Sequence, residues 1–201
     1  MKLQQEYRET TIINKSRFIA CVSRCDTEEE ARFYIDGIRR EFPDSSHVCT
    51  AYMLGDNGQV QRSSDNGEPA GTAGVPMLEA IRKSGLQNVC ACVVRYFGGI
   101  KLGAGGLIRA YGNSVSRCLE DAVLLEDVEY GCYKLVLDYE TANKIDHYLR
   151  NHTIDLQTAY DVEVTYTFAI NDGSILNKIS EFTKGLKPSY IGKQMIATVV
   201  K

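Results

Sequence analysis

The spacing of apolar and polar residues switches along the chain between the period of a strand and that of a helix, and so predicts a series of elements. Residues 11–24 mix β-branched and aromatic side chains as a strand or hairpin arm does, and Thr27-Glu28-Glu29-Glu30 has the form of a helix capping box. Gly55-Asp56-Asn57-Gly58 is a turn signal between two strands. The other elements predicted here are a helix over 31–42, strands over 48–54 and 59–63, a short helix between Pro76 and Gly85, a strand over 88–96 and a helix over 107–122.

A second series of elements begins at about Tyr130. Apolar residues alternate strictly along 162–170, as on a strand, whereas Ile175, Ile179 and Phe182 have helical spacing. The predicted elements are strands over 133–138, 153–159, 162–170 and 190–200 and helices over 141–151 and 174–184. Their order is βαββαβ, which is typical of a ferredoxin-like domain. We therefore expect an α+β chain with two domains, residues 1–126 and 130–201.

Composition and charge narrow the class of protein. The chain has 201 residues, 44% hydrophobic and 24% charged, as in ordinary globular proteins. The formal net charge is −3 and neither half is basic, so the chain as a whole does not attract nucleic acid and no DNA specificity is expected. No apolar run approaches the roughly 20 residues that span a bilayer, and the start lacks a signal-peptide core, so we expect a cytoplasmic protein without a membrane partner. Seven cysteines, an odd number, predict reduced thiols.

The run from Arg95 to Tyr111 holds five glycines between a predicted strand and a predicted helix. Glycine permits close approach and positive φ, so successive amides can point into one concavity at a helix N-terminus, where an anion is favoured. Three cations lie in or beside the run and would strengthen contacts to a phosphate or carboxylate. The residues predicted to bind an anion or RNA are Arg95, Gly98, Gly99, Lys101, Gly103, Gly105, Gly106 and Arg109.

A purely structural role explains the same run equally well. The glycines would then only let the loop fold tightly against the sheet, and Arg95 and Arg109 would pair internally with Asp65 and Glu68. The spacing does not decide between the two interpretations. The run is neither a Walker phosphate loop nor a dinucleotide fingerprint, and no cofactor is predicted.

A second loop, residues 63–76, carries two carboxylates three positions apart. Asp65 and Glu68 could converge as an acid–base pair, but Asp in a turn and Glu near a helix start more often accept hydrogen bonds from local amides. We assign Asp65, Glu68, Gly71 and Thr72 to a loop that supports the glycine-rich run. His47 lies two residues from Cys49, but no further Cys or His completes a zinc-like quartet, and no metal site is predicted.

These segments together resemble the YigZ/IMPACT family. The resemblance rests on 15–20, 46–52, 65–76 and above all 95–111, and extends over most of the first 125 or so residues. It implies a ribosomal protein S5 domain 2-like first domain and, in bacterial-type members, a second domain similar to the last domain of elongation factor G. Eukaryotic relatives act in translational control by binding the activator of a starvation-responsive kinase, and carry an RWD domain for which this chain has no room. Asn66 stands where the family has Asp, which argues further against an Asp pair in acid–base catalysis.

The favoured interpretation is a non-catalytic regulatory protein linked to translation that contacts the ribosome, RNA or a translation-associated protein; no residue is assigned a catalytic role. One alternative is a small-molecule or nucleotide-dependent enzyme that uses the Asp65/Glu68 and Arg95–Arg109 loops. The other is a protein–protein interaction module whose second domain docks partners through aromatic residues. Its tyrosines are Tyr133, Tyr139, Tyr160, Tyr166 and Tyr190.

Overall fold

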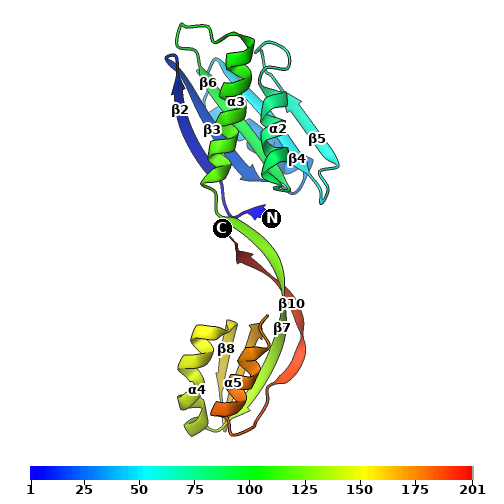
Figure 1. Cartoon of the computed structure of the whole chain (residues 1–201), viewed down its shortest axis with the longest axis vertical. Helices are drawn as coiled ribbons and strands as arrows, with labels where there is room; N and C mark the ends of the chain where they lie inside the picture. Colours follow the sequence, from blue (N-terminus) through cyan, green and yellow to red (C-terminus); the bar gives the residue numbers. More distant parts are fainter. Residues whose placement is uncertain (201) are drawn as a thin grey trace. The chain divides into compact units, whose positions relative to one another are not determined.

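The computed structural model describes residues 1–200, and these divide into two compact units. Unit 1 comprises Met1–Glu126 together with the end of the chain from Val199, and unit 2 comprises Asp127–Thr198. Figure 1 colours the chain along the sequence, from blue at the N-terminus to red at the C-terminus. In the part of the chain described, no helix is long and apolar enough to cross a membrane.

Unit 1 is a five-stranded sheet with helices on both faces. The strand order is β2-β3-β6-β4-β5, and every pair in it is antiparallel. Figure 1 shows α2 and α3 on one face of this sheet. Its elements are β1 (Lys2–Leu3), β2 (Tyr7–Ile13), β3 (Ser16–Arg24), α1 (Glu28–Glu41), β4 (His47–Leu54), β5 (Val60–Ser64), α2 (Gly74–Ser84), β6 (Val89–Tyr96), α3 (Gly103–Glu120) and the start of β7 (Leu124–Leu137).

The central strand β6 explains the three layers. It is buried from Val89 to Arg95, so both of its faces need cover. Val89, Ala91 and Val93 pack into the core under α2 and α3, whereas Cys90, Cys92 and Val94 pack into a second core under α1. The strict alternation of side chains along a strand produces this division. Cys90 and Cys92 therefore share one face of the strand.

Two local features position the candidate site. The hairpin between β2 and β3 turns at Asn14 and Lys15, both with positive φ, so the predicted element over 11–24 is in fact the end of one strand and the whole of the next. Helix α3 begins at Gly103 rather than at Leu107. The first turn of α3 therefore contains Gly103, Gly105 and Gly106. Glycine has low helix propensity, so the sequence pattern did not predict this turn as helical.

Unit 2 has the predicted βαββαβ order. Its elements are β7, α4 (Tyr139–His152), β8 (Ile154–Tyr160), β9 (Val164–Ile170), α5 (Ser174–Phe182) and β10 (Ser189–Val199), and its strands are ordered β10-β7-β9-β8. A separate core joins α4 and α5 to the sheet around Ile145, Tyr166 and Ile179. Strand β7 starts at Leu124, well before the predicted 133–138, so the expected boundary at 126–130 lies inside a strand.

The tyrosines proposed for docking lie in different environments. Tyr166 belongs to the core. Tyr139 and Tyr160 are exposed and stack on each other, with ring centroids 6.5 Å apart, and Tyr190 is exposed with an edge contact to Tyr133. The aromatic residues of unit 2 thus divide between core and surface.

Candidate functional site

The two predicted loops meet at a cavity of about 520 Å³ beside the ends of β4 and β6. Direct pairing of His47 with Arg95 in the sheet brings the start of one strand next to the end of the other. The cavity is lined by Ser46, His47, Glu68, Pro69, Arg95, Phe97, Lys101, Leu102, Gly103, Ala104 and Leu107. Arg95, Lys101, Gly103 and Glu68 were predicted from the sequence, and the structure brings them together here.

Arg95 and Glu68 form a buried ion pair at the base of this cavity. Arg95 Nη1 lies 2.6 Å from Glu68 Oε1, and the two side chains are only 5% and 4% exposed. Tyr111 donates its hydroxyl to the same oxygen at 2.7 Å, and Arg95 Nη2 lies 3.4 Å from Ser16 Oγ. Burial is the main cause that raises the pKa of Tyr111, so it remains a neutral donor. The charge of Arg95 is thus largely balanced within the protein, as the structural interpretation expected.

One donor of Arg95 remains unused. Its Nε is buried and has no hydrogen-bond partner. Among the described side chains, the other buried nitrogen or oxygen without a partner is Glu9 Oε2. An unsatisfied buried donor costs about 1–3 kcal/mol, and such atoms in folded proteins usually have a water or a ligand as partner. Arg95 lines the cavity, and this donor lies buried beneath the cavity surface.

The N-terminus of α3 is open toward the same cavity. Leu102 precedes the helix and provides no side-chain cap, and no acidic residue lies in the first turn. The first amides of a helix have no partner within it, and together with the helix dipole they favour an anion. Gly103 has a φ of +70°, which a residue with a side chain adopts only with strain. Lys101 is exposed and forms no ion pair among residues 1–200.

The first part of the glycine-rich run is structural. The amides of Phe97 and Gly98 donate to Ser46 Oγ and Ser16 Oγ, at 3.0 and 3.1 Å. A Cβ on Gly98 would collide with the backbone of Lys15, because the β2–β3 turn packs directly against it. The amides of Phe97 and Gly98 are therefore engaged within the protein and are not open to a ligand.

Arg109 is not brought to Arg95. It is exposed on α3 and lines a separate depression of about 330 Å³ with Asn14, Leu102 and Asn113. Gly106 lines this second depression. A Cβ built on Gly105 would lie 3.7 Å from Nη1 of Arg109. The predicted set of cations thus divides between two sides of the first turn of α3.

Asp65 organises the supporting loop. Its carboxylate accepts from the amides of Gly71, Ala73 and Gly74 at 2.8, 3.0 and 2.8 Å. Burial raises the pKa of Asp65, but these three hydrogen bonds outweigh burial and leave the pKa below its ordinary value. Thr72 is buried and donates to the Pro69 carbonyl at 2.7 Å. Asp65 therefore holds the loop and the start of α2, which matches the local amide contacts expected of it.

His47 also lines the cavity, although the sequence assigned it no role at this site. Its Nδ1 lies 2.9 Å from the Asn66 carbonyl, so that nitrogen carries the proton and the ring is oriented. Cys49 follows on the same face but donates to the Asp65 carbonyl, and burial raises the pKa of its thiol to about 12. It is therefore a poor nucleophile. Among residues 1–200, no three His, Cys, Asp or Glu side chains converge in a way that could hold a metal ion.

The chain is similar in sequence to known proteins of one family. Residues 14–119 match the family described as Impact N-terminal domain. The IMPACT family member YvyE of Bacillus subtilis (strain 168) is 49% identical over 139 residues, which cover 69% of this chain and 64% of that protein. The IMPACT family member YigZ of Escherichia coli (strain K12) is 41% identical over 136 residues, which cover 67% of each. The chain thus matches about two thirds of the length of these relatives.

The likeness extends to a solved structure. One match is a chain in a structure titled "Crystal structure of an hypothetical protein", which is 32% identical in sequence. The match covers 100% of this chain and 97% of that one, with a TM-score of 0.61. The match therefore extends over both sheets of this α+β chain.

Proposed function

Because the chain belongs to the IMPACT family, we propose that it is a non-catalytic regulatory protein linked to translation, which binds a phosphate of ribosomal RNA at the N-terminus of α3. The link to translation rests on the family resemblance, whose eukaryotic members act in translational control. We further propose that unit 1 has the ribosomal protein S5 domain 2-like fold and unit 2 the ferredoxin-like fold of the last domain of elongation factor G. Both are architectures of ribosome-associated proteins, which supports the proposal by analogy.

One observation carries the choice of site: the uncapped N-terminus of α3 and the exposed Lys101 line the same cavity. Both offer N–H donors, which suit an oxyanion and leave no role for a cation. Lys101 adds the one positive charge in the lining that no described carboxylate balances. A phosphate oxygen can therefore accept from the amides and from Lys101 together.

The hydrogen bonds disfavour the enzyme alternative. Asp65 already accepts three amides, and Glu68 accepts from Arg95 and Tyr111. A general base needs a free lone pair within reach of its substrate. Acid–base work by either carboxylate would compete with the hydrogen bonds by which it holds its loop.

Lys101→Glu is the sharpest test of the site. Arg95→Ala is unsuitable, because it would leave Glu68 buried without its partner. Purified ribosomes are sedimented with the wild type and with Lys101→Glu over a series of salt concentrations. We expect wild-type binding to weaken as salt rises, and the variant to bind at least about tenfold more weakly with a salt slope lower by about 1.

Lys187→Glu provides the matched control, because it makes the same charge change at an exposed position of unit 2. It should bind as the wild type does. Equal binding by the Lys101→Glu variant, or no ribosome binding by the wild type, would refute the proposed ligand. Retention of a partner after nuclease treatment would point to an acidic protein instead.

A further inference from the structure

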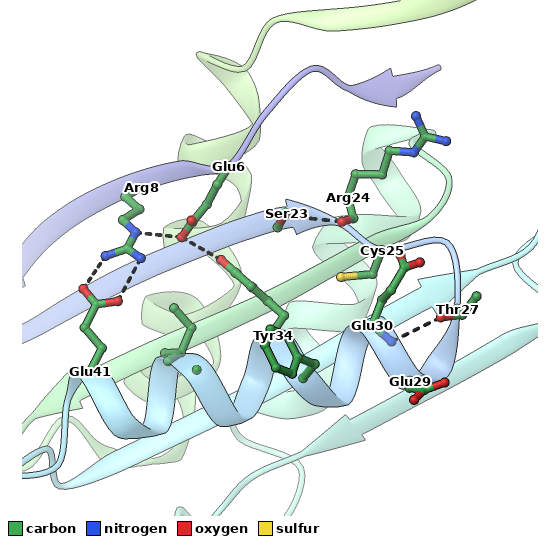
Figure 2. Close-up of a pocket in the computed structure, with 13 residues that line it drawn as sticks. Glu6, Arg8, Ser23, Arg24, Cys25, Thr27, Glu29, Glu30, Tyr34 and Glu41 are labelled. Carbon is green, nitrogen blue, oxygen red and sulfur yellow. Dashed lines mark hydrogen bonds and ion pairs between the residues drawn. The ribbon is translucent and has the colours of Figure 1, made fainter.

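A second cavity of unit 1 lies along helix α1. It is a groove of about 780 Å³ between α1, the beginning of β2 and the end of β3 (Figure 2). Thirteen residues line it: Glu6, Arg8, Ser23, Arg24, Cys25, Thr27, Glu29, Glu30, Phe33, Tyr34, Gly37, Ile38 and Glu41. None of them belongs to the cavity at α3.

Ion pairs join the two walls of the groove at one end. Arg8 on β2 reaches across to Glu41 at the end of α1, with Nη2 2.9 Å from Oε2, and its Nε lies 2.7 Å from Glu6 (Figure 2). Tyr34 donates its hydroxyl to Glu6 at 3.0 Å. The hydrogen bond from Arg8 lowers the pKa of Glu41, so the link persists at neutral pH. These contacts connect β2 with the C-terminal end of α1 across the groove.

The wall formed by α1 exposes apolar surface. Phe33 is 74% exposed, whereas Tyr34 and Ile38 beside it are half-buried and buried. A large exposed aromatic residue on the rim of a groove is a typical anchor for a partner, because covering it removes apolar area from water.

Gly37 points to an occupant independently of the apolar surface. It lies inside α1, where glycine is a poor helix former, and its φ is not in the left-handed range. A Cβ built on it would meet no atom within 4 Å. Neither backbone conformation nor packing within the protein therefore requires glycine. A bare helix backbone at the wall of a groove permits close approach of another molecule.

The charge of the groove identifies the kind of occupant. Four carboxylates and two guanidinium groups line it, a net charge of −2. Arg8 is paired with Glu6 and Glu41, and Arg24 is paired with Asp26. Glu30 accepts from the Asp26 amide, whereas Glu29 is exposed and has no ion pair among the described residues. The end of the groove near Glu29 is thus available to a cation.

We propose that this groove docks a basic amphipathic segment of a partner protein, which passes over Gly37, packs an aliphatic side chain against Phe33 and directs an arginine or lysine toward Glu29. A guanidinium near the Phe33 ring gains a cation–π contact as well. The partner is opposite in charge to the anion proposed for the cavity at α3. The groove is therefore a separate binding surface, and its test does not depend on ribosome binding.

The test uses the full chain and a fluorescent synthetic peptide of alternating arginine and leucine, followed by anisotropy. We expect saturable one-to-one binding that weakens with salt, and no binding of a matched glutamate–leucine peptide. Gly37→Met fills the groove with a better helix former. It should raise the melting temperature or leave it unchanged, while weakening the arginine–leucine peptide at least tenfold.

A pair of charge variants on the same helix completes the test. Glu29→Gln should weaken binding about three- to tenfold at low salt and reduce its salt dependence. Asp36→Asn removes the same charge from α1 outside the groove and should leave binding unchanged. Absence of peptide binding to the wild type, wild-type affinity in Gly37→Met, or equal effects of the two charge variants would each overturn the proposal.

Discussion

The buried pair of Arg95 and Glu68 yields the most demanding prediction. Glu68→Gln keeps the shape of the side chain but removes its charge, and leaves a guanidinium that is 5% exposed without a counter-charge. Removing one partner of a buried ion pair costs about 3–5 kcal/mol. For a unit of this size, we expect the melting temperature of unit 1 to fall by roughly 10–15 °C.

A double-mutant cycle separates the pair from its surroundings. Arg95→Met removes the other charge, and the double variant removes both. Because a buried charge no longer lacks a partner in the double variant, its loss of stability should be smaller than the sum of the two single losses by about 2 kcal/mol. Urea unfolding measures each free energy, and hydrogen–deuterium exchange along β6 assigns the transition to unit 1.

The same chemical change at a surface site is the control. Glu163→Gln, exposed in unit 2, should alter the free energy of unfolding by less than about 0.5 kcal/mol. If Glu68→Gln cost less than about 1 kcal/mol, or if the two single losses simply added, the pair would not hold the loops together as argued.

Three further predictions follow from other contacts. Asp65→Asn should lower the unfolding free energy by about 2 kcal/mol, because the carboxylate accepts hydrogen bonds from three amides. The folded pKa of Asp65 is depressed, so this loss of stability is present above about pH 4 and should shrink as pH falls through the folded pKa. A loss that does not depend on pH would contradict the assignment. Gly98→Ala should destabilise unit 1 by at least about 2 kcal/mol in urea unfolding, because the added Cβ meets the Lys15 backbone; an unchanged midpoint would show that the turn is not packed there. Ile145→Ala should cost about 2–5 kcal/mol in unit 2, and exchange in β6 should not rise with it if the two cores are independent.

Regular hydrophobic patterns predicted most of the fold correctly. The apolar, β-branched run over 88–96 predicted the central strand, and the order βαββαβ is that of unit 2. Errors arose where local composition conflicts with the final structure. Gly103 to Gly106 resemble a loop, yet they form the first turn of α3, and no turn signal interrupts the sequence at Asn14 and Lys15.

The site was harder to predict than the fold because it depends on which residues meet. The sequence alone named Arg95, Lys101 and Glu68, and two interpretations of Arg95 were equally open. Only the packing of Glu68 against Arg95 and Tyr111 shows that its charge is balanced inside the protein. The place of His47 beside Arg95 follows from strand register, which hydrophobicity alone does not determine.

The long strand β7 has a consequence for engineering. Leu124 and Leu125 pair with Leu3 and Lys2, and the Val200 amide donates to the Leu124 carbonyl at 3.0 Å, so both ends of the chain attach to the same short stretch of backbone. In topological terms, residues 127–198 are an insertion within unit 1. Excision of that insertion, with Glu126 rejoined to Val199 by a short glycine linker, should conserve more of the native hydrogen bonding of unit 1 than truncation after Glu126. For the same reason the present termini are a natural place to close the chain into a circle and open it elsewhere.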